Sequence, residues 1–205
     1  MKTKKFFLLI ILVLAFFLRF YKLGQVPPSL EWDEVAIGYD AYSILKTGRD
    51  QFGNFLPLSF RSFDDYKPPL YEYLTVLSVA VFGPTEFAVR FPSALLGTLT
   101  VLATYYLVNE LFLTSHFSLL TSFLLAISPW HLQFSRGAFE VNIAVFLLTL
   151  AVFCFYRGFK TPKFFYFSSL LFGLGLFSYH SDRVVFPLIL VSLFLIFQKE
   201  LVLKI

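Results

Sequence analysis

An acidic cluster, Glu31-Trp32-Asp33-Glu34, stands immediately before a segment with helical apolar spacing. Carboxylates at the start of a helix are ordinarily explained by the exposed backbone N–H groups and the helix dipole, which favour negative charge there. A catalytic role is the alternative, because the cluster follows the first apolar segment by only a few residues. If that segment crosses a membrane, Asp33 and Glu34 lie near its surface, where a water-poor cleft raises the pKa of a carboxylate toward that of a general base. Both interpretations stay open on these residues alone.

A lysine followed by two prolines is the second candidate, within the segment Asp64–Pro69. The prolines can begin a helix, because their missing N–H groups would have no helical partner anyway, and they direct the chain just after Lys67. Lys67 could contact a phosphate, or it could be a membrane-surface lysine that snorkels. Without a ligand, we expect it to pair with an acidic residue of this segment or of the first cluster. The neighbouring candidates for substrate binding are Asp65 and Tyr66.

A third polar stretch contains Arg136 and Glu140, which are candidate substrate-binding residues. They are four positions apart and would share one face of a helix, as structural ion pairs often do. Just before them, Trp130 and His131 are most simply interpreted as residues of the aromatic belt at a membrane surface.

The polar stretch before the last apolar segment contains His180, a further candidate for substrate binding, and Arg183. Arg183 could contact a donor phosphate, and it could equally anchor a helix end. The three histidines are scattered without metal-ligand spacing, and the sequence contains no glycine-rich phosphate loop, serine nucleophile elbow or paired-cysteine motif. We therefore expect no cofactor, with a divalent cation left open, and no site for a cytosolic nucleotide.

The composition indicates a membrane protein. Of the 205 residues, 58% are hydrophobic and 15% charged, against about 25% charged in globular proteins, and the mean hydropathy is +0.74. A single Cys excludes a disulfide framework and a cysteine-based zinc site. The net charge of +4 raises nucleic acid as a partner, but membrane proteins concentrate Lys and Arg in cytoplasmic loops for orientation alone. We expect an all-α integral membrane protein with no nucleic-acid partner.

Apolar segments that can approach the roughly 20 residues needed to cross a bilayer are candidate transmembrane helices. Their approximate spans are 6–22, 91–112, 115–132, 138–156, 164–180 and 184–200. The acidic stretch 24–90 is predicted to be a structured loop with juxtamembrane helices over 33–47 and 68–83.

The segment Leu70–Phe82 decides the topology, because it is apolar but short for a span at about 13 residues. If it does not span, the basic clusters around Lys4, Lys160 and Lys199 all lie on the cytoplasmic side, as the positive-inside rule requires. We therefore expect a plasma-membrane protein with a cytoplasmic N-terminus and with its polar stretches on the outer face.

Pieces spread along most of the chain resemble the membrane glycosyltransferases that use a polyprenyl-phosphate-linked sugar, a superfamily that includes the protein O-mannosyltransferases and the lipid A aminoarabinose transferase. The pieces are the pair Asp33-Glu34, K-P-P-L at Lys67–Leu70, F-G-P-T-E-F-A-V-R-F-P-S-A-L at Phe82–Leu95 and S-P-W-H-L-Q-F-S-R at Ser128–Arg136. The resemblance implies a multi-helix bundle of GT-C type with its active site on the outer face. It also implies an inverting transfer to a hydroxyl group without a nucleotide sugar at the site.

The resemblance also implies roles for individual residues. Asp33 matches a proposed general base, Glu34 its partner, and Lys67 a cation that contacts the lipid-linked phosphate. Glu140 stands near a second acidic residue of the relatives, and Arg183 near a basic one. The implied partners are a polyprenyl-phosphate-linked sugar, membrane lipids, and a lipid, glycan or protein acceptor. Family members usually continue through further helices, so this chain is expected to be an N-terminal catalytic part or a truncated product.

Two other classes stay open. One is a transporter or lipid flippase, in which the outer charges merely bind headgroups, and the other is a non-catalytic membrane scaffold. Ionisable residues in the middle of the bilayer or inverted repeats would favour transport, and the sequence has neither. A glycosyltransferase is therefore the function predicted from the sequence.

Overall fold

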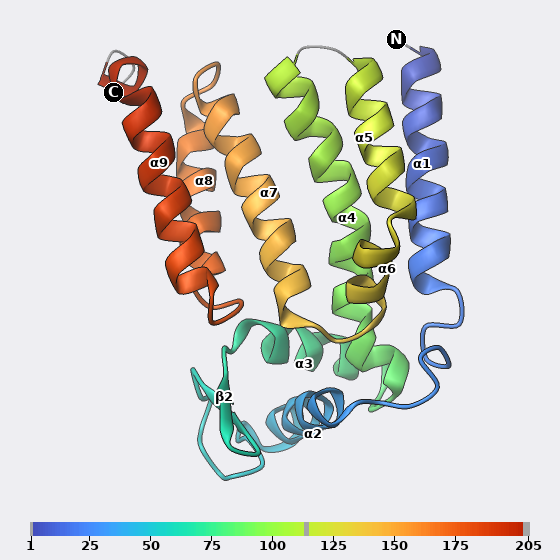
Figure 1. The fold of residues 1–205 in the computed structure, drawn as a ribbon. Coiled ribbons are helices and arrows are strands. Elements are labelled where there is room, and N and C mark those ends of the chain that lie inside the picture. The colour runs from blue at the N-terminus through green and yellow to red at the C-terminus, as the bar shows by residue number, and fades with distance from the viewer. Residues whose placement is uncertain (1, 113–114, 203–205) are drawn as a thin grey trace.

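The computed structural model describes residues 2–112 and 115–202, and these are mostly helical (Figure 1). The helices are α1 (Lys2–Phe20), α2 (Trp32–Thr47), α3 (Leu70–Phe82), α4 (Glu86–Phe112), α5 (Ser115–Ile127), α6 (Pro129–Arg136), α7 (Glu140–Gly158), α8 (Lys163–Gly175) and α9 (Asp182–Val202). Strands β1 (Phe60–Ser62) and β2 (Asp65–Lys67) form a small antiparallel hairpin. The predicted all-α fold class is confirmed.

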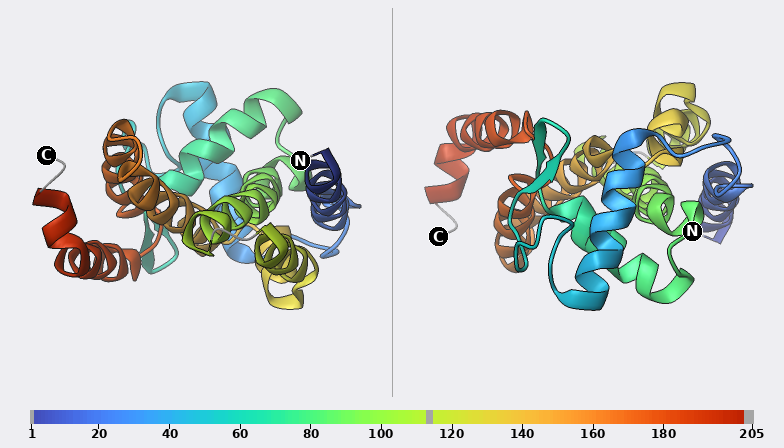
Figure 2. Two further views of the ribbon diagram at one scale, coloured as in Figure 1. Left: turned by 90° about the horizontal axis from the view of Figure 1, so that it is seen from above. Right: turned by 90° about the horizontal axis from the view of Figure 1, so that it is seen from below.

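Helices α1, α4, α5, α7, α8 and α9 run side by side, and α2, α3 and the hairpin lie across one end of them (Figures 1 and 2). Both chain termini lie at the opposite end. Helix α4 is central, since it packs against α1, α2, α3, α5, α6 and α7. We call the end that carries α2, α3 and the hairpin the α2–α3 end.

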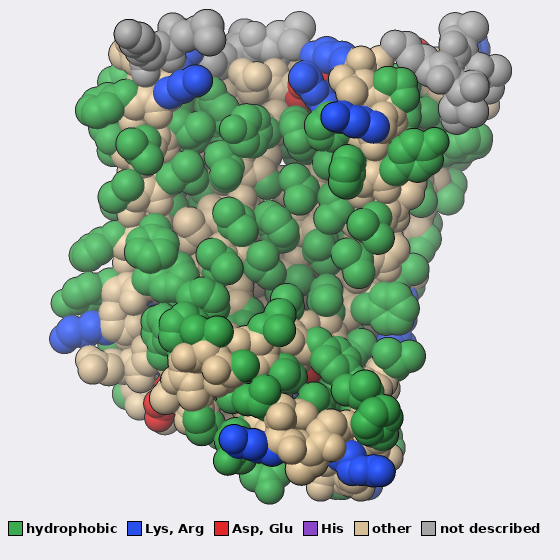
Figure 3. Space-filling view, turned by 180° about the vertical axis from the view of Figure 1, so that it is seen from behind, with side chains coloured by type: hydrophobic (Ala, Val, Ile, Leu, Met, Phe, Trp, Pro, Cys, Tyr) green, Lys and Arg blue, Asp and Glu red, His purple; other side chains and the backbone are tan. Residues whose placement is uncertain are grey.

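Three of the described helices are long and apolar enough to cross a bilayer: α4, α7, and α9 over Asp182–Leu201. The predicted spans at α5 and α8 are shorter, with 13 residues each, or about 20 Å at about 1.5 Å per residue. Hydrophobic side chains cover the band between the two ends of the bundle, and Lys and Arg lie toward the ends (Figure 3). This distribution is that of an integral membrane protein.

The predicted span over 115–132 is not one helix. Helix α5 ends at Ile127, and α6 begins separately at Pro129. Proline is favourable in the first turn of a helix, but it would remove a hydrogen bond from the interior of a continuous one. A second break separates Arg136, the last residue of α6, from Glu140, the first of α7. The prediction that these two residues share a helix face is therefore wrong.

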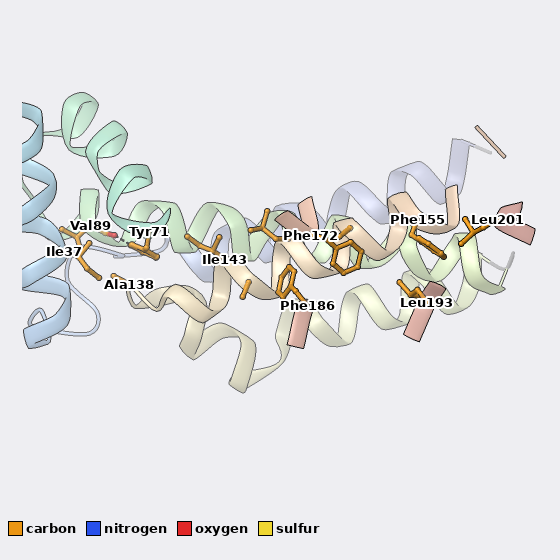
Figure 4. Close-up of a cluster of buried hydrophobic side chains, with 13 residues drawn as sticks. Ile37, Tyr71, Val89, Ala138, Ile143, Phe155, Phe172, Phe186, Leu193 and Leu201 are labelled. Atoms are coloured by element: carbon orange, nitrogen blue, oxygen red, sulfur yellow. Dashed lines mark hydrogen bonds between the residues drawn. The ribbon is translucent and has the colours of Figure 1, made fainter. Parts of the chain in front are cut away.

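An apolar core runs along the bundle (Figure 4). At the α2–α3 end it includes Ile37, Tyr71 and Val89, and toward the other end it reaches Phe155 and Leu201. The hydroxyl of Tyr71 donates to the carbonyl of Val89 at 3.0 Å, so the polar atom of this buried ring is satisfied. This contact holds the start of α3 on α4.

Arg19 is buried where α1, α5 and α6 meet. Its guanidinium donates to the carbonyl of Ala126 at 3.2 Å, which the end of α5 leaves without a helical partner, and to Nδ1 of His131 at 2.7 Å. His131 is therefore buried, and its interpretation as an aromatic-belt residue is wrong. The adjacent Trp130 is exposed.

Arg136 closes the C-terminal end of α1. Its guanidinium donates at 2.7–3.3 Å to the backbone carbonyls of Leu18, Arg19, Tyr21 and Val26. The last turn of a helix leaves such carbonyls free, and a cation also suits the helix dipole there. Arg136 therefore fixes the exit of α1 at the α2–α3 end.

A buried ion pair joins α2 to α4. Nε and Nη2 of Arg90, which is fully buried, donate to the two carboxylate oxygens of Glu34 at 2.9 and 2.8 Å. Such a bidentate pair is strong and directional. The guanidinium also donates to the carbonyls of Leu23, Pro27 and Ser29 at 2.7–3.2 Å. One side chain thus sets the path of the chain from α1 into α2.

Burial alone would raise the pKa of Glu34, but its hydrogen bonds hold the pKa below the ordinary value. The donors are Arg90 and the backbone amides of Ala138 and Glu31. The resulting stability is present above the pKa of glutamate in the unfolded chain, and it is lost as the pH falls through the lower folded-state pKa.

Removing Arg90 should leave Glu34 as an uncompensated buried charge. We expect Arg90→Ala to lower the free energy of unfolding by about 3–5 kcal/mol at neutral pH, and the loss to shrink in acid as Glu34 is protonated. Thermal unfolding of the purified protein in detergent measures both effects. Arg183→Ala is the control, because Arg183 is exposed and should change stability by less than about 0.5 kcal/mol. Equal losses in the two variants would contradict the role of Arg90.

The bundle predicts which loops share a side of the membrane. Single cysteines at the exposed positions of Asp64 and Ser181 should react with an impermeant reagent from one side, and those at Lys4 and Lys163 from the other. The buried Cys154 is first replaced by alanine. Asp40 is unsuitable, because it is buried although it belongs to the polar stretch. Labelling of all four positions from the same side would disprove this arrangement.

Candidate functional site

A cleft of about 390 Å³ lies at the α2–α3 end. Its walls come from the start of α2, β2, α6, the start of α7 and the loop between α8 and α9. Folding therefore brings distant polar stretches into one site, with an apolar side that includes Phe134 and Phe139. The polar lining residues are Glu31, Asp33, Glu34, Asp65, Lys67, Glu140, Tyr179 and His180.

The hairpin determines which of its residues reach the cleft. Successive side chains of a strand point to opposite faces. Asp65 and Lys67 accordingly line the cleft, whereas Tyr66 between them is exposed and lies outside it. The pairing of Phe60 with Lys67 and of Ser62 with Asp65 sets this register.

Lys67 lies at the centre of the charged cluster. Its Nζ is 3.2 Å from Oδ2 of Asp33, 3.9 Å from Oδ2 of Asp65 and 3.9 Å from Oε1 of Glu140. The prediction that Lys67 pairs with a neighbouring carboxylate is confirmed, and Asp33 is the nearest of the three. The motif around Lys67 could not show that Glu140 is also a partner of Lys67, because Glu140 lies much further along the chain.

Burial would lower the pKa of Lys67, but the charges of Glu140, Asp33 and Asp65 outweigh burial and raise the pKa above the ordinary lysine value. The ammonium group is therefore charged at physiological pH, and its contribution to stability is lost only as the pH rises through that raised pKa. The cleft thus holds a lasting positive charge, which can stabilise an anionic group.

Asp33 is presented to the cleft by the first turn of α2. Its side chain is 40% exposed, and Oδ1 accepts a hydrogen bond from the hydroxyl of Ser62 at 3.4 Å. The N-terminus of α2 is capped by its neighbours, because the amide of Glu31 donates to Glu34 at 3.1 Å in a capping box. Asp33 is therefore not required as the helix cap.

Glu34 also lines the cleft, but its carboxylate is already engaged. Oε1 accepts from Arg90 and from the amide of Ala138 at 2.9 Å each, and Oε2 accepts from Arg90 and from the amide of Glu31. Glu34 therefore links α2, α4 and the segment before α7. This geometry is that of a positioning residue for the adjacent Asp33 rather than of a proton acceptor.

Glu140 enters the cleft from the first turn of α7, where the helix dipole favours a carboxylate. The residue is 8% exposed, and Oε1 has no hydrogen-bond partner among the described groups. Glu140 thus shares Lys67 with Asp33 and keeps a free acceptor position.

The first turn of α3 carries a carboxylate, Glu72, for which the sequence predicted no role. Glu72 is 1% exposed, and its Oε2 has no partner in the described part of the chain. Burial, together with the nearby charge of Glu140, raises the pKa of Glu72 well above the ordinary value. The neutral form is favoured, so Glu72 adds less negative charge to the cluster. Its sequence signal was a single acid in an otherwise apolar segment.

The remaining candidates divide into two groups. His180 lines the cleft, with Nε2 3.9 Å from Oδ1 of Asp65. Arg183 is exposed on the first turn of α9, and Arg136 is occupied by the end of α1. The structure therefore unites Asp33, Glu34, Asp65, Lys67, Glu140 and His180, and it leaves Tyr66, Arg136 and Arg183 outside the cleft.

Over residues 2–112 and 115–202, no group of three or more His, Cys, Asp or Glu side chains is arranged to hold a metal ion. The absence of a cofactor stays a prediction.

Two relatives match most of the chain. A protein of Aquifex aeolicus described as "Uncharacterized protein" is 31% identical over 167 residues, which are 80% of this chain and 32% of that protein. A protein of Bacillus subtilis described as "Putative mannosyltransferase YycA" is 29% identical over 170 residues, which are 80% of this chain and 23% of that protein. The chain thus spans about a third and a quarter of their lengths. No solved structure gives a significant match.

The family match includes several cleft residues but not the acidic cluster at the start of α2. Residues 66–205 match the model of the dolichyl-phosphate-mannose-protein mannosyltransferase family. This range contains Lys67, Glu140 and His180, while Asp33 and Glu34 precede it. Because the match extends over more than half of the chain, the chain belongs to the dolichyl-phosphate-mannose-protein mannosyltransferase family.

Proposed function

We propose that the cleft transfers a sugar from a polyprenyl-phosphate-linked donor to a hydroxyl group of an acceptor. Asp33 is the general base and Lys67 binds the donor phosphate. The observation that carries this proposal is the position of the Lys67 ammonium, held among Asp33, Asp65 and Glu140 in a cleft at one end of an apolar bundle. Family membership supports a glycosyl transfer that uses a lipid-linked sugar.

The cleft is amphipathic in a way that suits such a donor. Its polar side holds Lys67, and its other side holds Phe134 and Phe139, whose ring centroids are 5.0 Å apart. A lipid phosphate has an anionic head and a hydrocarbon chain, so it needs both kinds of surface within a few ångströms. A soluble anion would need only the first.

Donor binding also frees the base in this proposal. While Nζ of Lys67 lies 3.2 Å from Oδ2 of Asp33, an acceptor hydroxyl has to compete with the ammonium group for that oxygen. An arriving phosphate offers Lys67 a charge-assisted hydrogen bond in exchange. Asp33 then accepts the proton of the acceptor hydroxyl, while Glu140 remains beside Lys67 as its other partner.

In the transfer step, the acceptor oxygen forms a bond to the anomeric carbon as the bond from that carbon to the phosphate oxygen breaks. The acceptor proton goes to Asp33, and the bonding electrons leave with the polyprenyl phosphate. Negative charge therefore grows on the phosphate next to Lys67, where a fixed cation in a half-closed cleft stabilises it. A single displacement of this kind inverts the anomeric configuration.

The proposed active face is the outer one. Basic residues gather at the end of the bundle opposite the cleft, and Lys and Arg favour the cytoplasmic side. Their positions are Lys4, Lys5, Arg157, Lys160, Lys163 and Lys199. The plasma membrane is the proposed location, with the donor reaching the cleft from the outer leaflet.

The first test concerns the base. With polyprenyl-phosphate mannose as donor, Asp33→Asn should reduce turnover by about 10²–10⁴, the usual contribution of a general base, with donor affinity largely retained. Release of polyprenyl phosphate by the protein in lipid nanodiscs measures turnover. Asp64→Asn is the matched control, because Asp64 is exposed in the hairpin turn outside the cleft. If Glu140→Gln loses turnover and Asp33→Asn does not, the base is Glu140.

The second test concerns the donor phosphate. Lys67→Ala should weaken binding of polyprenyl phosphate by about tenfold to a hundredfold, the value of one hydrogen bond to a charged group. Titration of nanodisc-embedded protein with polyprenyl phosphate measures this affinity. Lys46→Ala, at the exposed end of α2, should bind as the parent does. Unchanged affinity in Lys67→Ala would reject the phosphate role and favour a membrane-anchoring lysine.

A further inference from the structure

A second groove, of about 620 Å³, lies beside the cleft. One wall is the face of α2 that carries Trp32 and Tyr39, and the other is formed by Phe52 and by Phe63 of the hairpin turn. All four aromatic side chains are at least half exposed. Aromatic rings of this size are mostly buried in folded domains, so four exposed rings around one groove form a surface on which a ligand can pack.

The groove and the cleft share their walls. In the first turn of α2, Asp33 faces the cleft and Trp32 faces the groove. In the hairpin, Ser62 donates to Asp33 while the next residue, Phe63, lines the groove. A ligand in the groove would therefore end beside the proposed base.

Phe63 occupies its position at a conformational cost. It has φ +53° in the two-residue turn between β1 and β2, where glycine, asparagine or aspartate is the usual occupant. A bulky residue in the left-handed region is strained, and such strain is concentrated at binding and catalytic sites. The ring packs against Trp32 with centroids 5.9 Å apart at 50°, which leaves most of its surface open.

Polar groups are fixed between the rings. Buried Asp40 accepts hydrogen bonds from the backbone and side-chain amides of Gln51, at 2.8 and 3.1 Å, and thereby holds Gln51 on the groove wall. Arg61 stacks over Phe52 at 5.2 Å and donates to the carbonyl of Phe63 at 3.4 Å. The amide of Gln51 and the phenol of Tyr39 thus lie beside aromatic rings on the groove wall, and Arg61 supports Phe52 and Phe63.

Another groove on the surface, between α3 and α4, has a different lining. This groove, of about 310 Å³, is lined almost wholly by aliphatic and phenylalanine side chains, among them Leu77, Val81 and Leu95. That lining suits hydrocarbon. The aromatic groove instead lies along α2, which crosses the end of the bundle in the view from below (Figure 2). It needs an occupant that offers both C–H surfaces and hydroxyl groups.

We propose that the aromatic groove binds a saccharide, namely the glycan part of the acceptor. The C–H faces of sugar rings pack on exposed aromatic rings, and their hydroxyl groups bond to amide and phenol groups such as those of Gln51 and Tyr39. This assignment rests on the proposed function, because the shared wall with Asp33 makes the groove an acceptor site. It names the acceptor as a carbohydrate rather than a peptide or a simple lipid.

The chain offers a direct probe, since Trp32 and Trp130 are its two tryptophans. In Trp130→Phe protein, the emission comes from Trp32 alone. Soluble tetrasaccharides of mannose, glucose and N-acetylglucosamine are titrated into this protein in nanodiscs. We expect a saturable change in Trp32 emission with at least one of them, and none in the converse protein, Trp32→Phe, where Trp130 reports from α6.

Phe63→Gly separates binding from folding. Glycine relieves the strained φ, so the variant should be at least as stable as the parent. It should nevertheless bind the saccharide about threefold to tenfold more weakly, the value of one aromatic contact. Leu58→Ala is the matched control, because Leu58 is similarly exposed in the segment before β1 but does not line the groove. Equal affinities of Phe63→Gly and the parent would overturn the assignment.

Brominated lipids test the competing occupants. They should quench Trp130 strongly and Trp32 weakly. Strong quenching of Trp32 without a response to any tetrasaccharide would mean that the aromatic surface enters the bilayer. A response to serine- or threonine-containing peptides alone would mean a peptide site. Saccharide binding is measured without the donor, so this proposal can fail while the Asp33 and Lys67 variants behave as expected, and the converse also holds.

Discussion

Arg90 and Glu34 meet in a buried, bidentate ion pair that links α4 to α2. The same carboxylate accepts from the amide of Ala138, just before α7, and the same guanidinium holds the carbonyls of the segment that leads from α1. Four parts of the chain therefore meet at two side chains. The positions of Asp33 and Glu140 in the cleft depend on this junction, because each lies within two residues of one of its hydrogen-bonding groups.

Burying the Arg90–Glu34 ion pair costs desolvation free energy. Two desolvated charges are stabilising only when every lone pair and N–H group finds a partner. The Glu34 carboxylate and most of the Arg90 guanidinium do so here. The result is a rigid frame next to a loosely satisfied cluster, in which Lys67 is shared among three carboxylates. Oε1 of Glu140 has no hydrogen-bond partner within the described part of the chain. Rigid support and an exchangeable cation are the combination that a phosphate site requires.

The charges in the cleft also fit the proposed phosphate site. Asp33, Asp65 and Glu140 surround one ammonium group, and Glu72 lies close enough for its pKa to respond to Glu140. Burial favours the neutral form of Glu72, which limits the excess negative charge. In the proposed function, an arriving phosphate therefore takes Lys67 from a carboxylate rather than meeting a free cation. This exchange couples phosphate binding to the release of the base, because Lys67 gives up Asp33 as it gains the phosphate.

Much of the fold was determined by features local in the sequence. Long apolar runs can satisfy their backbone groups in a membrane only as helices, so the helical bundle follows from hydropathy. The Pro-Pro pair after Lys67 and Gly48 after α2 likewise mark where helices begin and end, since each restricts or permits a particular backbone conformation. Asp33 and Lys67 were also identifiable, because their motifs are short and contiguous.

Only the tertiary structure decided how these pieces meet. The break at Pro129 divided an apolar run that hydropathy could not distinguish from one span. A second break, after Arg136, removed the helix that would have paired Arg136 with Glu140. Arg136 went instead to the carbonyls of α1, and Glu140 went to Lys67. The side-chain partners of a charged residue are set by which helix ends lie together in space. That arrangement depends on packing across the whole bundle, and spacing along one segment carries no record of it.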